Sequence, residues 1–133
     1  MAETFRERYG VTVLQIWGMT ETNPLGVIAT PTPLLMAEGE QFATETILTR
    51  QGRMQFGIEL RIIDDEGAPL AWDGEQAGKL QVRGCSLFSG YEKNDEINKS
   101  SFTADGWFRT GDLASMDAQG NVRLRGRTSD ADD

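Results

Sequence analysis

The chain has 133 residues, which is a usual size for one domain and enough for a modest apolar core. Twenty-one acidic residues against thirteen basic ones give a formal net charge of −8, which disfavours electrostatic binding to nucleic acid or to an anionic membrane. The sequence contains no histidine, so no His-based catalytic triad or zinc site can form within the chain.

The N-terminal stretch and the single cysteine indicate the cellular compartment that we expect for the protein. Residues 1–10 are charged and amphipathic, unlike a signal peptide, and no apolar run reaches the length of a membrane span. Cys85 is alone, so no internal disulfide can form, and we expect it to be a small buried apolar residue. We therefore expect a cytoplasmic protein with no transmembrane segment and no nucleic-acid partner.

The chain is expected to begin with a helix followed by a strand. Phe5 and Tyr9 are four residues apart between charged positions, which predicts an amphipathic helix over residues 2–9 that ends at Gly10. The β-branched residues that follow predict a short strand over residues 11–16.

The next segment is rich in proline. Residues 23–38 hold three of the four prolines, so we expect little regular structure there apart from a brief strand near residues 25–28. Residues 39–50 predict a short surface helix that is closed by Gly52.

The second half of the chain has the alternating apolar and polar residues that are typical of β-strands. Apolar and charged residues alternate over residues 58–62 and 79–83, and two further strands are predicted around a turn at residues 117–121. One helix is expected at residues 94–100. The predicted fold class is therefore α/β, or α+β for this stretch: the end of an α/β subdomain followed by a small, mostly antiparallel β subdomain.

The first of three polar clusters is WGMTET, on the loop expected just after a strand, where α/β folds bind ligands. Trp17 offers a ring for stacking on a base, and Gly18 allows close backbone approach. Thr20 and Thr22 offer hydroxyls to phosphate. The single carboxylate of Glu21 suffices for a Mg²⁺ ion that bridges phosphate oxygens. Taken one by one, these residues also fit a core tryptophan, turn threonines and a solvated charge.

The other two clusters are DGWFRTGDL and RLRGRTSD. Asp112 can accept hydrogen bonds from two ribose hydroxyls, although the residues alone favour an aspartate that caps its own turn. Arg127 can reach a phosphate or ribose oxygen. Ser129 and Asp130 have the look of a boundary, because the closing ADD has no apolar residue.

Together and in this order, the clusters resemble the AMP-binding superfamily of adenylate-forming enzymes, which includes acyl-CoA synthetases, nonribosomal-peptide adenylation domains and luciferases. WGMTET is similar to the family's adenine and magnesium motif, and GKLQVRGCSLFSGY, ending at Tyr91, to its Gly-rich β-subdomain motif. GWFRTGDLA is similar to its ribose motif and RGRTSD to the start of its hinge. Trp17 with the residues after it looks most like the medium- and long-chain fatty acyl-CoA ligases.

The resemblance implies a role for each candidate residue. Trp17 would stack on adenine, Thr20 would contact the α-phosphate, and Glu21 would hold Mg²⁺. Asp112 would bind the ribose hydroxyls, and Arg127 would support ribose or phosphate. The candidate catalytic residues are thus Thr20 and Glu21, the metal ligand is Glu21, and the nucleotide-binding residues are Trp17, Gly18, Thr20, Asp112 and Arg127.

The resemblance also implies a reaction in two halves. A carboxylate attacks the α-phosphate of ATP to give acyl-AMP and pyrophosphate, and a thiol, usually coenzyme A, then takes the acyl group. ATP or AMP, Mg²⁺ and coenzyme A are the implied cofactors and co-substrates. The implied substrate is a small-molecule carboxylic acid, and we expect a fatty acid.

By the same resemblance the chain divides into three parts. Residues 1–52 would end the α/β AMP-binding subdomain, residues 53–126 would form a distorted β-barrel-like subdomain, and residues 127–133 would start the hinge. The family's Ser/Thr/Gly-rich phosphate loop and its C-terminal domain with a catalytic lysine have no counterpart in the sequence. We therefore expect part of a ligase that is inactive by itself and works with the missing N- and C-terminal parts.

Two alternatives stay open. One is a non-catalytic module that binds a nucleotide or a protein. The other is part of an amino-acid adenylation domain, which would differ in its substrate.

Overall fold

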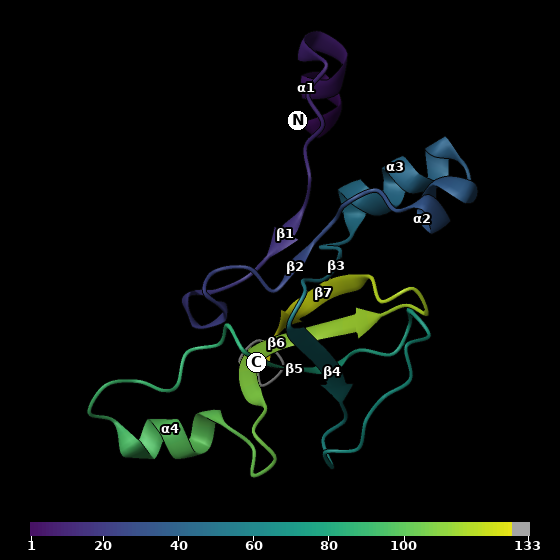
Figure 1. The fold of residues 1–133 in the computed structure, drawn as a ribbon. Helices are drawn as coiled ribbons and strands as arrows, with labels where there is room; N and C mark the ends of the chain where they lie inside the picture. The colour runs from purple at the N-terminus through teal and green to yellow at the C-terminus, as the bar shows by residue number, and fades with distance from the viewer. Residues whose placement is uncertain (129–133) are drawn as a thin grey trace.

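The computed structural model describes residues 1–128 and combines helices with two antiparallel sheets, as Figure 1 shows. The helices are α1 (Ala2–Tyr9), the 3-10 turn η1 (Thr20–Thr22), α2 (Pro33–Ala37), α3 (Glu40–Thr49) and α4 (Asp95–Ser101). The strands are β1 (Ile16–Trp17), β2 (Val27–Ile28), β3 (Arg53–Met54), β4 (Ile58–Ile63), β5 (Gly78–Gly84), β6 (Phe108–Met116) and β7 (Val122–Arg127). The predicted mixture of helices and antiparallel strands is confirmed.

The larger sheet is built from the second half of the chain, in the order β4-β5-β6-β7. Each strand pairs antiparallel with the next along the chain, and Ile62 of β4 lies opposite Leu80 of β5. Alternate side chains point into the core, where Ile62, Leu80 and Val82 are almost fully buried. Burial of each such side chain is worth roughly 1.5–3 kcal/mol, which explains why the alternation predicted these strands well.

The smaller sheet consists of the two-residue strands β1, β2 and β3. Trp17 of β1 pairs with Val27 of β2, which in turn pairs with Met54 of β3. The side chains of Trp17 and Val27 belong to the same apolar core as those of β4 to β7. The two sheets therefore share one core, and this brings the first polar cluster against the larger sheet.

A second, smaller core lies under α2 and α3. Ala43 and Ile47 of α3 pack there with Leu35 of α2. The helix α2 corrects the expectation that residues 23–38 lack regular structure apart from one strand. It forms because the hydroxyl of Thr32 accepts a hydrogen bond of 3.1 Å from the backbone nitrogen of Leu35, and because Pro33 suits the first turn of a helix.

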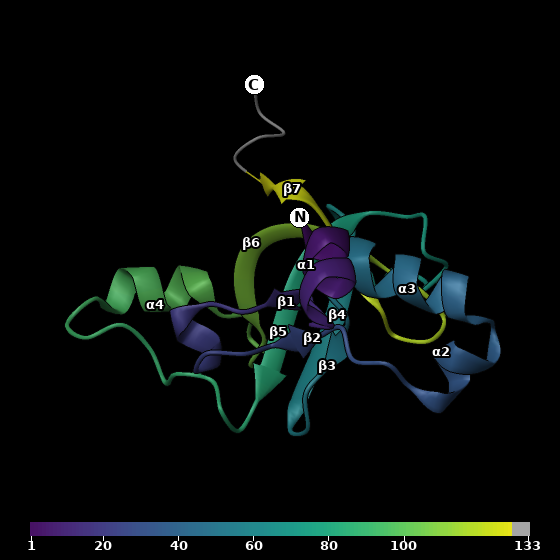
Figure 2. The same ribbon diagram turned by 90° about the horizontal axis from the view of Figure 1, so that it is seen from above.

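The strand expected at residues 11–16 is also corrected, because only Ile16 of that segment is in β1. Among the described residues, no strand pairs with residues 11–15. The helix α1 that precedes them has no buried residue and stands away from the sheets in Figure 1. Figure 2 shows α4 and the α2–α3 pair on opposite sides of the sheets.

Cys85 is exposed, which corrects the expectation of a buried apolar residue. It lies just after the end of β5, beyond the part of the strand that faces the core. No helix in residues 1–128 has the length and apolar character to cross a membrane.

The division at residues 52 and 126 and the barrel-like closure stay predictions. The described residues show an open sheet with β4 and β7 at its edges. Most of the predicted hinge, residues 127–133, lies outside the described part of the chain, as do Ser129 and Asp130.

Candidate functional site

The first and second polar clusters meet at Trp17 and Asp112. The indole Nε1 of Trp17 donates a hydrogen bond of 2.7 Å to Oδ2 of Asp112. Trp17 is 6% exposed and Asp112 is 8% exposed, so the bond lies at the edge of the core. The six-membered ring of Trp17 packs so closely over Gly26 that a β-carbon there would collide with it.

The third cluster joins the first two through Arg127. Arg127 lies directly opposite Asp112 in the β6–β7 register, and its guanidinium is 3.3 Å from Oδ1 of Asp112. The side chain of Arg127 is 58% exposed, whereas that of Asp112 is 11% exposed. Asp112 is thus a strand residue whose two oxygens have different partners, and the alternative of an aspartate that caps its own turn is wrong.

Glu21 has a partner that the sequence did not indicate. The hydroxyl of Tyr91 donates a hydrogen bond of 2.6 Å to Oε1 of Glu21, and the backbone nitrogen of Phe88 donates one of 3.0 Å to the carbonyl oxygen of Glu21. The Glu21 carboxylate, by this hydrogen bond first and then with burial, raises the pKa of the Tyr91 phenol to about 12. Side chain and backbone of Glu21 are therefore both held by the loop that follows β5.

An aromatic cluster ties that loop to the larger sheet. The ring of Phe88 lies 4.8 Å from that of Tyr91 and 5.1 Å from that of Phe108, both in edge-on contact. Phe108 is the first residue of β6, the strand that carries Asp112. The loop that holds Glu21 and the strand that carries Asp112 are thus packed together through Phe88.

The rest of WGMTET forms a tight turn. A β-carbon at Gly18 would collide with the carbonyl oxygen of Pro24, so the close approach that Gly18 permits is that of the chain itself. The hydroxyl of Thr22 is buried, accepts a hydrogen bond of 2.9 Å from the backbone nitrogen of Met19, and lies 2.8 Å from the carbonyl oxygen of Pro24. Thr22 is therefore a turn residue, whereas the side chain of Thr20 is exposed.

The structure thus places the predicted residues in two adjoining groups. Trp17 and Arg127 both contact Asp112, and Glu21, four residues after Trp17, is joined to Tyr91. Within residues 1–128, no set of three or more cysteines, aspartates and glutamates is arranged to hold a metal ion.

Comparison with known proteins identifies the family. The sequence pattern described as AMP-binding enzyme matches residues 1–92, which is more than half of the chain. The chain belongs to the AMP-binding enzyme family. The resemblance inferred from the four motifs is therefore confirmed.

Curated relatives from the AMP-binding family cover nearly the whole chain. The 3-methylmercaptopropionyl-CoA ligase of Ruegeria lacuscaerulensis is 38% identical over 133 residues, which is 98% of this chain and 23% of the relative. The medium-chain-fatty-acid–CoA ligase of Ectopseudomonas oleovorans is also 38% identical, over 132 residues and the same shares. A nonribosomal peptide synthetase of Aspergillus terreus is 44% identical over 80 residues, which is 59% of this chain and 8% of that protein.

Solved structures support the same assignment. The apo crystal structure of MatB from Rhodopseudomonas palustris matches with a TM-score of 0.78 and 30% identity, over 97% of this chain and 23% of that one. The acyl-CoA synthetase-like fold that we predicted is thereby confirmed. The chain spans 23% of the length of the two ligases and of MatB.

Sequence reasoning missed Tyr91 as a site residue, although it had placed this tyrosine at the end of a motif. Glu21 and Tyr91 are 70 residues apart, and no periodicity or spacing relates them. Only the packing of the loop after β5 against η1 brings them together.

Proposed function

We propose that this chain supplies the ribose side and part of the metal side of the nucleotide site in an ATP-dependent acyl-CoA ligase. The observation that carries the proposal is that Asp112 contacts both Trp17, 95 positions away in the chain, and Arg127 of the adjacent strand, so that residues of three motifs meet at one carboxylate. Membership of the AMP-binding family and the likeness to two acyl-CoA ligases support it.

Asp112 is suited to bind two neighbouring hydroxyls. A carboxylate has about four lone-pair positions, and Trp17 and Arg127 each occupy one of those on Asp112. Each oxygen of Asp112 therefore keeps a position that can accept a hydrogen bond from a ligand hydroxyl. Both partners keep the group oriented, and the exposed guanidinium of Arg127 adds a positive charge beside it. A diol that donates to both oxygens would form charge-assisted hydrogen bonds.

Stacking of adenine on Trp17 stays a prediction. The indole ring is 6% exposed and packs over Gly26, so little of its surface is open in the described chain. Its second task is clear from the geometry, because its N–H holds Asp112 in place. Gly18 acts through the turn that sets the direction of Trp17 and η1.

Glu21 fits the part of a metal ligand. The hydrogen bond from Tyr91 engages Oε1 and leaves Oε2 for a cation. One carboxylate is enough for Mg²⁺ when phosphate and water fill the rest of its shell. The bound ion would neutralise charge on the phosphates during attack by the substrate carboxylate. Thr20, exposed one residue before Glu21, would donate its hydroxyl to the α-phosphate.

The finer assignments belong to the same proposal. We propose a carboxylic acid substrate of the fatty-acid type, coenzyme A as the acyl acceptor, and a cytoplasmic location. The remaining parts of the site, including the phosphate loop and the lysine, would come from sequence beyond the part that matches this chain. Residues 1–133 alone would then bind a nucleotide weakly and would not catalyse acyl-CoA formation.

The amino-acid adenylation domain is the second candidate, because a nonribosomal peptide synthetase is 44% identical over 59% of this chain. We favour the acyl-CoA ligase since the two ligases match over 98% of the chain. The nucleotide subsite would be the same in both, and only the acid would differ.

Nuclear magnetic resonance of the isotopically labelled chain tests the nucleotide subsite. Addition of millimolar AMP should shift signals of residues 17–22, Asp112 and Arg127. AMP lacking both ribose hydroxyls should produce smaller shifts at the same concentration, as should AMP itself with the Asp112→Ala variant. Equal shifts for both ligands, or an unchanged response of Asp112→Ala, would contradict the role of Asp112.

A further inference from the structure

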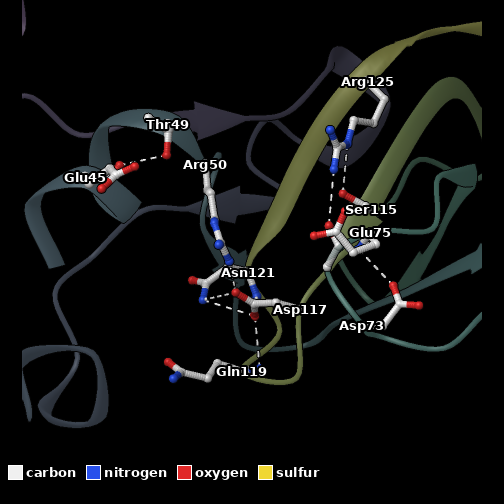
Figure 3. A network of polar contacts seen from close by, with 11 residues as sticks. Glu45, Thr49, Arg50, Asp73, Glu75, Ser115, Asp117, Gln119, Asn121 and Arg125 are labelled. Atoms are coloured by element: carbon white, nitrogen blue, oxygen red, sulfur yellow. Dashed lines mark hydrogen bonds and ion pairs between the residues drawn. The ribbon is translucent and has the colours of Figure 1, made fainter. Parts of the chain in front are cut away.

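A polar network at the far end of the β6–β7 hairpin ties that hairpin to α3 (Figure 3). Arg50, the residue that follows α3, forms an ion pair with Oδ2 of Asp117, and the two side chains are 28% and 20% exposed. Oδ1 of Asp117 accepts hydrogen bonds from the backbone nitrogens of Gln119 (3.0 Å) and Asn121 (2.9 Å). One carboxylate thus closes the β6–β7 turn and also binds the end of α3.

The two residues after Arg50 strengthen the same junction. The backbone nitrogen of Gln51 donates to the carbonyl oxygen of Val122 (2.9 Å), and the nitrogen of Val122 donates to the carbonyl oxygen of Gly52 (2.7 Å). The side-chain oxygen of Gln51 accepts a hydrogen bond of 2.8 Å from the nitrogen of Leu124. Three consecutive residues of one segment therefore hold the turn end of the hairpin.

The opposite end of this hairpin carries the nucleotide-site pair. Asp112 lies opposite Arg127 near the open end, while Met116 and Val122 are paired beside the turn. Asp112 and Asp117 are five positions apart, which corresponds to about 17 Å along an extended chain. A small rotation at the turn would therefore displace the Asp112 carboxylate at the other end.

The held segment also leads to Trp17. Residues 50–52 run directly into β3, which pairs with β2, and β2 pairs with β1, where Trp17 lies. Gly52 packs against the backbone of Ile28 so closely that a β-carbon there would collide with it. The two partners of the Trp17–Asp112 hydrogen bond are thus connected through the junction at Arg50 by strand pairing and backbone hydrogen bonds.

The open end of the hairpin needs such an outside support. The β6–β7 register shifts between Leu113 and Ala114. Gly111 has φ 78° and Gly126 has φ 141°, values that other residues rarely adopt. Next to Asp112 and Arg127, the strand pairing is therefore irregular and does not by itself fix where the two side chains point.

We propose that Arg50 is a positioning residue, which acts with Asp117 to set the Asp112–Arg127 pair against Trp17. This role rests on the proposed nucleotide site, but its geometric part concerns only the Trp17–Asp112 hydrogen bond. Loss of the ion pair loosens the hairpin at its turn and lets Asp112 move away from the indole. Nucleotide binding weakens as a result, although Arg50 touches no ligand.

The indole N–H resonance of Trp17 tests the geometric part without any ligand. The Asp112→Ala variant of the 133-residue chain marks its position when the hydrogen bond is lost. Arg50→Ala should move the resonance toward that position, and Arg50→Lys, which keeps the charge, should restore most of it. Asp117→Asn keeps an oxygen that can accept the hydrogen bonds of the turn but removes the ion pair. It should therefore shift the Trp17 resonance in the same direction as Arg50→Ala, and it provides the test if Arg50→Ala does not fold.

Arg125→Ala is the matched control on the same hairpin. Arg125 donates a hydrogen bond to Ser115 Oγ (3.0 Å), as Figure 3 shows, and another to the carbonyl oxygen of Gly74 (3.2 Å). Neither of these partners belongs to α3. Arg125→Ala should leave the Trp17 resonance in place. An unchanged Trp17 resonance in folded Arg50→Ala and Asp117→Asn, or an equal shift in Arg125→Ala, would overturn the proposal.

AMP titration separates this proposal from the proposed function. AMP should bind Arg50→Ala about tenfold more weakly than the unaltered chain, since a displaced Asp112 weakens charge-assisted hydrogen bonds to the ribose, and the loss of one such bond has an effect of this size or larger. Equal AMP affinity despite a moved Trp17 resonance would overturn the positioning role. If no form binds AMP and the resonance still moves, the proposed nucleotide site is wrong while the link from Arg50 to Asp112 is upheld.

Discussion

The indole Nε1 of Trp17 lies 2.7 Å from Oδ2 of Asp112, and this hydrogen bond joins residues 95 positions apart in the chain. It connects the short β1 strand with the middle of β6. Because Asp112 is almost buried, loss of the donor leaves a carboxylate with one partner fewer at the edge of an apolar core. The bond therefore serves stability as well as the candidate site.

Trp17→Phe should destabilise the chain by about 2–4 kcal/mol, because a charge-assisted hydrogen bond of about 1.5–3 kcal/mol is lost and the smaller ring leaves space in the core. Urea unfolding followed by circular dichroism measures the change. Trp72→Phe is the control, since Trp72 is 39% exposed, and it should change the free energy of unfolding by less than about 0.5 kcal/mol. Equal effects of the two substitutions would show that the Trp17 hydrogen bond contributes nothing.

Glu21→Gln and Asp112→Ala should impair adenylation by different routes in a ligase of full family length that carries this segment. Glu21→Gln keeps the shape but removes the charge, so raised Mg²⁺ should restore part of the rate of acyl-AMP formation. Asp112→Ala should raise the KM for ATP about tenfold or more at every Mg²⁺ concentration, because hydrogen bonds of about 1.5–3 kcal/mol are lost.

The control for both substitutions is Glu92→Gln. Glu92 is exposed, and the ion pair it forms within residues 1–128 is with its neighbour Lys93 at 3.4 Å, so removal of its charge should leave both kinetic constants unchanged. Identical Mg²⁺ responses of Glu21→Gln and Asp112→Ala would argue against separate metal and ribose roles.

The Tyr91 phenol should lose its proton at a higher pH than an ordinary tyrosine. Its hydrogen bond to the Glu21 carboxylate raises its pKa from an ordinary value near 10 to about 12. The folded state favours the neutral phenol, so this contribution to stability is complete below pH about 10 and disappears as the pH rises through about 12. Tyrosinate absorbance in a Tyr9→Phe background measures Tyr91 alone, because the chain has two tyrosines.

Glu21→Gln should lower the pKa of Tyr91 toward 10, since the charged acceptor is the largest cause of the shift. Glu92→Gln, one residue from Tyr91 in sequence, is the control and should leave the titration unchanged. A Tyr91 titration that does not respond to Glu21→Gln would mean that the 2.6 Å hydrogen bond is absent in solution.

Gly52→Ala should destabilise the chain more than Gly67→Ala does. Both glycines have positive φ, 103° and 89°, so each substitution carries a backbone strain of about 1–2 kcal/mol. A β-carbon at Gly67 meets open space, whereas one at Gly52 collides with the backbone of Ile28. The collision adds a steric cost to the backbone strain, so Gly52→Ala should lower the free energy of unfolding by more than about 3 kcal/mol. Equal midpoints of urea unfolding for the two variants would contradict the close packing of Gly52.

The strands of the larger sheet were predictable because alternation of apolar and charged residues has a direct physical cause. Leu80 and Val82 are apolar at every second position, and a pleated strand turns those positions to one face. The short helix α2 was missed since three prolines lie in its neighbourhood, and the Thr32 cap that starts it carries a weaker signal than the prolines. Residues 11–15 have strand composition, but a strand also needs a paired neighbour.

The sequence by itself determined the family and the strands of the larger sheet, and its motifs supplied the candidate residues. These follow from local order along the chain: four motifs in sequence, and a two-residue alternation. Only the tertiary structure decided that Trp17 donates to Asp112, that Tyr91 donates to Glu21, and that Arg50 pairs with Asp117. Each of these contacts joins residues 67 to 95 positions apart, and no local pattern encodes which distant side chains a shared core will bring within hydrogen-bonding distance.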